Sequence, residues 1–120
     1  MTTRPSNTEK GRQAERLAAA YLESLGYSIL ATNWRCPLGE LDIVASMGTR
    51  LVFFEVKYRS GGAFGSGEEA LTRSKVLRLQ RLAQAYMQAD PSLRFASFGL
   101  EVVSVTRAPA GPEFRITPAI

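Results

Sequence analysis

Four charged residues near the middle of the chain have the types and the spacing of a catalytic cluster. Glu40 and Asp42 lie two residues apart in the segment GELDIVA, and Glu55 and Lys57 lie two residues apart in LVFFEVKYRS. Side chains two residues apart in a β-strand point to the same face. Charged residues are seldom fully buried unless they are paired or bound to something. Their position within apolar runs therefore needs an explanation.

A β-hairpin would bring these two pairs together. The segments are separated by a Ser/Gly/Thr turn, which favours two antiparallel strands. If the loop has two or four residues, counting outward from it sets Asp42 opposite Glu55. The same register sets Glu40 opposite Lys57, whereas a three-residue loop would break it. The hairpin thus predicts a cluster of carboxylates beside one lysine, conditional on the loop length.

Two carboxylates facing each other across strands repel, and the repulsion grows as water is excluded. A raised pKa, the Lys57 ammonium or a bound cation could each relieve it. Carboxylates without histidine favour Mg²⁺ or Mn²⁺, and such a site suits hydrolysis of a phosphodiester. The alternative is that these residues form charge pairs on a solvated face of a sheet. Against that alternative, the residues from Leu51 to Val56 are apolar on both faces, as in a covered strand.

The composition limits the chemistry further. The chain has 120 residues, one cysteine and no histidine, so histidine-based triads are excluded and a structural zinc site is not expected. The length and a hydrophobic content of 45% predict a single domain over residues 9–120 after a flexible lead at 1–8. The formal charge of +4 is compatible with a nucleic-acid partner.

The sequence also predicts where the protein works. No apolar run reaches the roughly 20 residues that a membrane-spanning helix needs, and the first residues have no apolar signal segment. One cysteine rules out an intramolecular disulfide, which fits a reducing compartment. We therefore expect a cytoplasmic protein with no membrane partner.

Hydrophobic periodicity predicts one mixed sheet with helices packed on it, in an α/β or α+β domain. Helices are expected over Glu9–Leu25 and from Thr72 or Ser74 to Gln88, with Thr72 as a possible N-cap. Strands are expected over Tyr27–Asn33, Glu40–Ala45, Leu51–Tyr58 and Phe95–Val105, and a short final strand over EFRIT at 113–117.

Basic residues are candidates for holding a nucleic-acid backbone. Those singled out are Arg59, Arg73, Lys75 and Arg78, and all but Arg59 lie on the second predicted helix. An ordinary solvated helix face is an equally good interpretation of that helix. The glycine-rich segment before it, RSGGAFGSGEEA, lacks the pattern of a phosphate-binding P-loop and is predicted to be a loop that could close on a bound strand.

The acidic residue on one strand and the Glu-Val-Lys on the next resemble the motif of the PD-(D/E)xK, or restriction-endonuclease-like, nucleases. More closely, the chain resembles the bacterial YraN family, which is similar in fold to archaeal Holliday-junction resolvases. The matching segments are GRQAERLAAAYLESLGY, NWRCPLGELDIVA, LVFFEVKYRS, FGSGEEAL and SKVLRLQRLAQAYM, within about residues 11–105.

This resemblance implies a restriction-endonuclease-like α/β fold and a Mg²⁺- or Mn²⁺-dependent DNA endonuclease, possibly acting on branched DNA as a homodimer. It implies that Asp42, Glu55 and Glu15 bind the metal and that Lys57 is the catalytic lysine on the attacking water. Glu40 matches an acid of the family motif and joins the catalytic set. Two alternatives remain: a nucleic-acid-binding module without turnover, and an adaptor for a protein partner.

Overall fold

The computed structural model of the protein describes residues 7–59 and 71–119. The glycine-rich segment that was predicted to be a loop lies outside these residues from Ser60 to Ala70, as does most of the predicted flexible lead. The described chain forms, in order, α1 (Asn7–Ser24), β1 (Ser28–Cys36), β2 (Gly39–Met47), β3 (Arg50–Arg59), α2 (Arg73–Ala89), β4 (Ser97–Thr106) and β5 (Glu113–Pro118).

The five strands form one mixed sheet in the order β1-β2-β3-β4-β5. β3 and β4 are parallel, and the other neighbouring pairs are antiparallel. A parallel pair needs a long crossover connection, and the segment between β3 and β4 contains α2. The predicted mixed α/β sheet with flanking helices is therefore confirmed. Among the described residues, no helix is both long enough and apolar enough to cross a bilayer.

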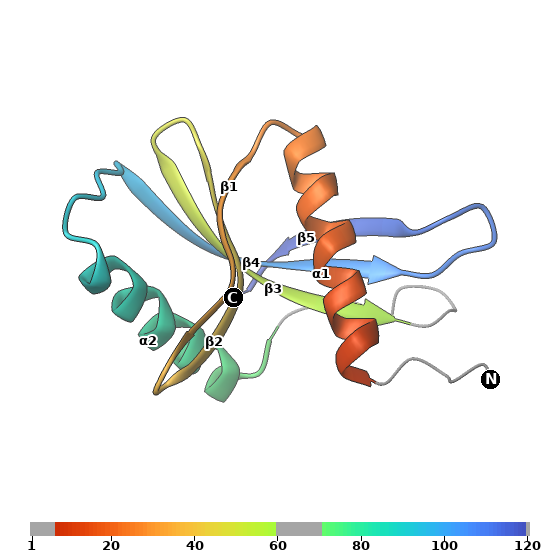
Figure 1. Ribbon diagram of the computed structural model, residues 1–120, viewed down its shortest axis with the longest axis horizontal. Helices are drawn as coiled ribbons and strands as arrows, with labels where there is room; N and C mark the ends of the chain where they lie inside the picture. The colour runs from red at the N-terminus through yellow and green to blue at the C-terminus, as the bar shows by residue number, and fades with distance from the viewer. Residues whose placement is uncertain (1–6, 60–70, 120) are drawn as a thin grey trace.

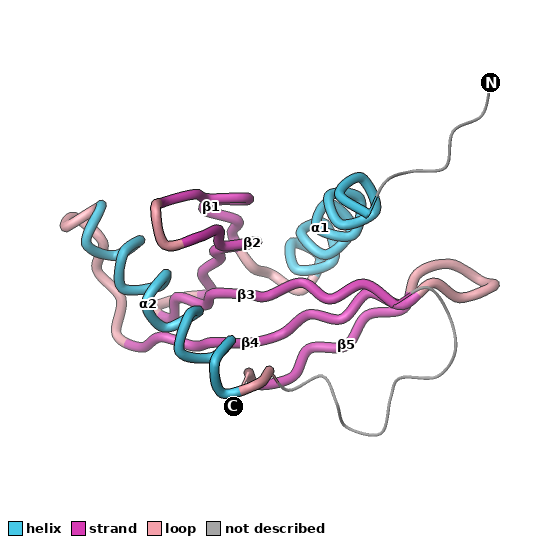
Figure 2. Tube along the Cα trace, turned by 90° about the horizontal axis from the view of Figure 1, so that it is seen from below, coloured by secondary structure: helices cyan, strands magenta, loops and turns pink. Residues whose placement is uncertain are grey.

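The two helices cover opposite faces of the sheet (Figure 2). On one face, Ala14, Ala18 and Leu22 of α1 pack against Val52 and Phe54 of β3, among others. On the other face, α2 packs against the alternate residues of β3; the buried set there includes Leu51, Phe53, Leu79, Leu82 and Ala83. All four residues from Leu51 to Phe54 have no exposed surface. The run that was apolar on both faces is thus the central strand, as predicted.

The element boundaries differ from the predicted ones by a few residues. α1 begins at Asn7, within the predicted lead, and ends at Ser24 just before Gly26, whose φ of 105° suits glycine. Thr72 is the N-cap of α2, and its side chain accepts a hydrogen bond from the Lys75 amide, as predicted. β1 is longer than predicted and runs to Cys36, because it pairs with β2 along its whole length.

The sheet divides beyond the middle of β3. β3 pairs with β4 from Arg50 to Arg59, but it pairs with β2 only as far as Ile43↔Phe54. The β1–β2 hairpin continues past this point and turns away from the end of β3 (Figure 1). β2 also twists here, because Leu41 packs on the α2 side and Ile43 on the α1 side, although residues two apart share a face in a regular strand. We call this place the fork.

The predicted register of the hairpin is confirmed where the two strands pair. Met47 pairs with Arg50 across the two-residue turn, where Gly48 has a φ of 58°. The ladder then ends one pair short of the acidic residues. Asp42 and Glu55 are therefore next to the last pair rather than in it, and the predicted Glu40–Lys57 ladder pair is wrong. The register is lost because β2 twists at the fork.

On the other edge of β2, Glu40 pairs with Arg35 of β1. β1 itself is irregular: the register shifts by one residue between Ile29 and Ala31, which leaves Leu30 as the extra residue. Asn33 has a φ of 51°, and it lies between the residues that pair with Leu41 and Ile43, so it is opposite Asp42. Both strands next to the fork thus depart from regular geometry there.

Candidate metal centre at the fork of the sheet

Asp42 fills the position that the missing strand pairing leaves open. Its Oδ2 atom accepts a hydrogen bond of 2.8 Å from the backbone amide of Val56. Val56 lies two residues beyond Phe54, where the β2–β3 ladder ends. A buried amide without a partner would cost about 1–3 kcal/mol. The carboxylate therefore satisfies the backbone of the neighbouring strand and is held in place by it.

A pocket of about 340 Å³ opens at the fork. Residues from both helices and from three strands line it; they are Gly11, Arg12, Glu15, Arg35, Glu40, Asp42, Glu55 and Arg78. We call it the fork pocket. Four carboxylates and three guanidinium groups thus share one small space. Of the predicted site residues, Glu15, Glu40, Asp42, Glu55 and Arg78 are brought together here.

Three of these carboxylates come close enough to share one cation. One oxygen each from Glu15, Glu40 and Asp42 lies within 4.8 Å of the others, and all three side chains are half-buried. Such oxygen donors are the ligands that Mg²⁺, Mn²⁺ and Ca²⁺ prefer. The residues present therefore fit a hard divalent cation. Glu55 lines the same pocket without belonging to this closest group of three.

The charge of this group is costly to the folded protein without a cation. Burial first, and then the neighbouring carboxylates of Glu55, Glu15 and Glu40, together raise the pKa of Asp42 to about 7. The Val56 hydrogen bond opposes the shift but does not cancel it. A bound cation would remove this penalty, because it favours the charged form of its ligands. The raised pKa is thus a second reason why the residues fit a metal.

Burial and nearby cations shift the pKa of Glu55 in opposite directions. Burial raises its pKa, while the Arg78, Lys75 and Lys57 side chains lower it, in that order of strength. The first two cations come from α2 and the third from β3 itself. Glu55 therefore connects the acidic side of the fork pocket with the basic side of α2.

Lys57 lies two residues beyond Glu55 on β3 and is half-buried. It does not line the fork pocket itself, but its ammonium is close enough to lower the pKa of Glu55. The predicted neighbourhood of lysine and carboxylate is therefore present. Its partner across the predicted ladder, Glu40, instead forms an ion pair with Arg35 at 3.1 Å.

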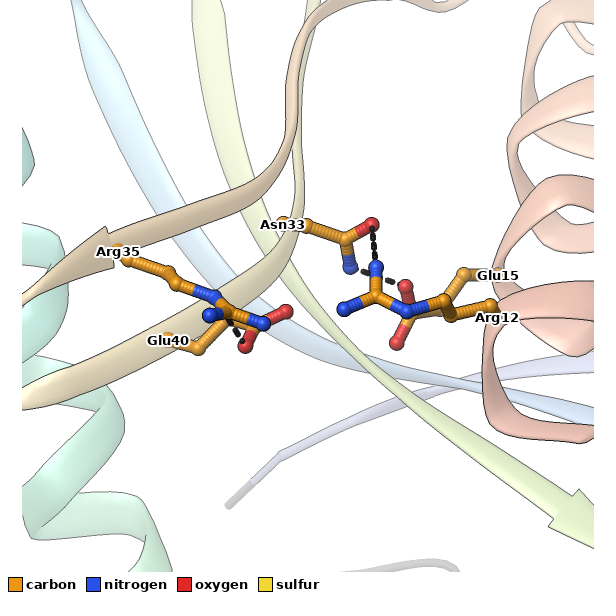
Figure 3. A network of polar contacts seen from close by, with 5 residues as sticks. All are labelled: Arg12, Glu15, Asn33, Arg35 and Glu40. Carbon is orange, nitrogen blue, oxygen red and sulfur yellow. Dashed lines mark hydrogen bonds and ion pairs between the residues drawn. The ribbon is translucent and has the colours of Figure 1, made fainter. Parts of the chain in front are cut away.

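Figure 3 shows two groups of polar contacts that face each other: the ion pair of Arg35 with Glu40, and Arg12 and Glu15 joined through Asn33. Asn33 donates a hydrogen bond to Glu15 and accepts one of 3.3 Å from Arg12, so that its amide links both α1 side chains to β1. Sequence reasoning missed Asn33, Arg12 and Arg35. The position of Arg35 close before Glu40 across a short turn could have indicated their pairing, whereas nothing in the sequence indicated the role of Asn33.

The four basic residues predicted to hold nucleic acid are not equivalent. Arg73, Lys75 and Arg78 are exposed on the first turns of α2, and only Arg78 lines the fork pocket. Arg59 is half-buried at the end of β3, where it pairs with Thr106 of β4. The α2 residues thus form a basic surface beside the pocket, and Arg59 is set apart from it on the strand.

The fold and the pocket define a class: a mixed α/β protein with carboxylates gathered where its central sheet divides. Residues 14–105 match the model of the "Uncharacterised protein family UPF0102". The chain belongs to the UPF0102 family, and the YraN-like resemblance is thereby confirmed at the level of the family.

Similar proteins come from several bacteria, and each is named only as a UPF0102 protein. One from Mycolicibacterium vanbaalenii is 44% identical over 105 residues, covering 88% of this chain and 86% of the relative. One from Beutenbergia cavernae is 46% identical over 101 residues, covering 84% and 85%. One from an Arthrobacter species is 48% identical over 101 residues, covering 84% and 85%. The family match over residues 14–105 includes all four carboxylates of the fork pocket.

Proposed function

We propose that the protein is a divalent-metal-dependent endonuclease that hydrolyses phosphodiester bonds of DNA, with branched DNA as its substrate. The observation that carries the proposal is the approach of Glu15, Glu40 and Asp42, whose carboxylate oxygens lie within 4.8 Å of one another. These donors favour Mg²⁺ or Mn²⁺. The resemblance to PD-(D/E)xK nucleases supports the same chemistry.

In this proposal Asp42 and Glu15 hold the metal, with Glu40 as the third oxygen of their close group. Glu55, which the family resemblance assigns to the metal, completes the set from the same pocket. When bound, the metal supplies a water of lowered pKa and positive charge beside the phosphate. The protein contributes rigidity: Asp42 is fixed by the Val56 amide, and Glu15 is fixed by Asn33. Such prior positioning is worth more than additional contacts, because the ligands need no reorganisation during the reaction.

The basic residues next to these acids are proposed to have different roles. Lys57 is proposed to hold the attacking water, which fits its position two residues from Glu55 on the same face of β3. Arg78, which lines the fork pocket, is proposed to bind an oxygen of the scissile phosphate. Arg73, Lys75 and Arg59 are proposed to hold the neighbouring phosphates. We further propose a cytoplasmic homodimer, since two active sites would suit two cuts in one branched molecule.

The test is a cleavage assay on four-way junction, flap, single-stranded and linear duplex DNA, with Mg²⁺ or Mn²⁺. The wild type is expected to cut at least one of these substrates and to stop when EDTA is added. Glu55→Ala and Lys57→Ala are expected to lower the rate at least 100-fold, since each removes a group assigned to the reaction. Light scattering on the same samples measures the oligomeric state.

Glu23→Gln is the matched control, because Glu23 is an exposed acid on α1 two turns beyond Glu15. It should cut like the wild type. Cleavage that survives both Glu55→Ala and Lys57→Ala would show that the assigned site is wrong. DNA binding without cleavage under any condition would favour the alternative of a binding module, which the exposed basic residues of α2 also support.

A further inference from the structure

A second pocket, of about 460 Å³, lies between the first turns of α1 and the loop from β4 to β5. Its lining differs from that of the fork pocket in charge. Lys10 and Arg107 contribute cations, and no carboxylate among the described residues lines it, whereas four carboxylates line the fork pocket. Both cations are exposed at the rim. The pocket therefore favours a ligand with negative charge.

About half of the surface of this second pocket is apolar. Leu17 and Val105 form part of its floor, and Pro109 and Pro112 form part of its wall. Tyr58 also lines it and is 37% exposed, so part of its ring is accessible to a ligand. An accessible aromatic ring beside rigid apolar walls suits a flat ring that can stack on it. The volume is within the range of small-molecule sites, about 300–1,000 Å³.

The two pockets share the same elements. On α1, Lys10 and Gln13 line the second pocket, while Gly11 and Glu15 line the fork pocket. On β3, Glu55 lines the fork pocket and Tyr58 lines the second one. Three residues of strand span roughly 10 Å. Residues three apart on a strand point to opposite faces, and the α1 residues of the two pockets lie on opposite flanks of that helix. A strand bound at both pockets would therefore have to pass around the N-terminal half of α1.

We propose that the second pocket binds one nucleotide of a nucleic-acid strand, with the base on Tyr58 and the phosphate between Lys10 and Arg107. This inference rests on the proposed function for the identity of the strand, and it adds a subsite for an unpaired nucleotide across α1 from the proposed cleavage site. Stacking of a base on an aromatic ring together with cations for the backbone is the general mode of binding single strands. Such a subsite would favour DNA with unpaired nucleotides that can pass around α1 from the point of cleavage.

The first experiment uses thymidine monophosphate with the isotope-labelled protein in EDTA, followed by NMR. The amides of Lys10, Leu17, Tyr58 and Arg107 are expected to shift in a saturable manner, and those of Asp42 and the α2 surface are not. Because no metal is present, the result does not depend on catalysis. Shifts confined to the fork pocket or to α2, or no shifts at all, would overturn the proposal.

The second experiment measures a single-stranded oligonucleotide containing 2-aminopurine, again in EDTA, and separates a nucleotide within a strand from a free one. Tyr58→Leu keeps an apolar side chain but removes the ring, and it should weaken binding about tenfold. Tyr58→Phe should bind like the wild type. Arg107→Gln should weaken binding severalfold, and less so at high salt. Arg94→Gln is the control, since Arg94 is an exposed arginine bonded to the Pro91 carbonyl.

The variants are first compared by thermal melting, so that a loss of folding is not taken for a loss of binding. Equal binding by Tyr58→Leu and the wild type would refute the subsite. If an acidic peptide shifts the same amides and thymidine monophosphate does not, the pocket is a peptide site and the proposal is wrong. Tyr58-dependent binding without any cleavage would support the subsite and refute the endonuclease. Cleavage of DNA without the NMR shifts would support the endonuclease and refute the subsite.

Discussion

Asp42 combines two tasks that make opposite demands on its charge. It accepts the hydrogen bond of the Val56 amide, which replaces the missing strand partner, and it stands among three other carboxylates. The hydrogen bond needs only an acceptor oxygen, whereas binding a cation together with the other carboxylates needs a negative charge. Asparagine would accept the same hydrogen bond without placing a buried charge among the carboxylates.

We therefore predict that Asp42→Asn stabilises the metal-free protein at neutral and higher pH. The pKa of Asp42 in the folded protein is about 7, above its ordinary value of 3.8. Folding therefore favours the protonated form, so the stability of the wild type falls as pH rises from about 4 to 7. The variant lacks this fall, and at pH 8 its Tm should be higher by several degrees, on the order of 1–2 kcal/mol.

The measurement is thermal melting in EDTA at pH 4, 6 and 8, with Glu23→Gln as an exposed control. At pH 4 the variant and the wild type should melt together. The interpretation fails if the wild type is as stable at pH 8 as at pH 4 and Asp42→Asn melts no higher. The pKa of Glu55 is also raised, so its ionisation also lowers the stability of the wild type as pH rises. Glu55→Gln should therefore, like Asp42→Asn, melt at a higher temperature than the wild type at pH 8 and with it at pH 4.

Asn33 illustrates how one residue can position another. Its φ of 51° is one that asparagine tolerates better than most residues, and its amide holds Glu15 while accepting from Arg12. Asn33→Gly keeps the backbone conformation and removes the amide. We predict that this variant binds Mn²⁺ about 10- to 100-fold more weakly, although it melts close to the wild-type temperature.

Calorimetric titration with Mn²⁺ checks this prediction, with thermal melting of the same samples. Asn33→Asp is the informative companion variant, because it retains an acceptor for Arg12 but places a second carboxylate against Glu15. It should have a larger thermal effect in EDTA than Asn33→Gly. Wild-type affinity for Mn²⁺ in both variants would mean that Asn33 does not position Glu15.

At the scale of the elements, α2 brings cations to an acidic site. Arg78 and Lys75 both lower the pKa of Glu55, and both are exposed to a partner in solution. If DNA phosphates bind there, Lys75→Gln and Arg78→Gln should each reduce the slope of log K against log salt by about 1. Arg94→Gln should leave the slope unchanged.

Fluorescence anisotropy of labelled DNA at several salt concentrations gives these slopes, in EDTA so that no cleavage occurs. Slopes that stay the same in both α2 variants would exclude α2 as the phosphate-binding surface. In that case the solvated-face interpretation of the helix would be the correct one. A loss of affinity that does not depend on salt would indicate altered packing instead.

At the scale of the whole molecule, the site exists only when the chain is folded. Glu15, Asp42 and Glu55 come from α1, β2 and β3, so a metal that binds them binds the folded state. We predict that Mn²⁺ or Mg²⁺ raises the Tm in a concentration-dependent manner. At 100 times the dissociation constant, the free energy of unfolding should increase by about 2.7 kcal/mol. Glu15→Gln and Asp42→Asn should lose most of this gain.

Melting curves over a range of metal concentrations, with K⁺ at matched ionic strength, measure the effect. A rise that is equal in the wild type and in both variants would point to general screening of charge. An unchanged Tm in the wild type at millimolar Mn²⁺ would contradict the metal site and would leave the carboxylate cluster without the cation that we assign to it.

Sequence reasoning succeeded where local patterns decide structure. The periodicity of α1 and α2, the continuous apolar run at Leu51–Phe54 and the turn at Gly48 each depend on nearby residues, and each was predicted. The carboxylates of β2 and β3 were grouped because strand alternation and turn length fix their neighbours. Glu15 was included only through the family resemblance, since on its own it resembled any solvated helix residue.

The remaining features depend on where regular structure stops. A counting argument assumes that the ladder continues, but the β2–β3 ladder ends at Ile43↔Phe54 and β2 twists. Glu40 therefore pairs with Arg35 and lies close to Asp42 and Glu15 instead of taking its predicted ladder place opposite Lys57. The conformation of Asn33 and its two hydrogen bonds follow from the same irregularity. No spacing rule describes such a fork before the whole sheet is assembled.

The irregularity of β1 has a consequence for solubility. β1 is an edge strand of the sheet, and a regular edge strand offers its free amides and carbonyls to the edge of another molecule. The extra residue at Leu30 and the left-handed conformation of Asn33 interrupt that row twice within four residues. Strand-to-strand growth of aggregates is thereby hindered at an edge where Leu30 is itself 42% exposed. Changes that straighten β1 to improve its pairing would therefore carry a risk of aggregation.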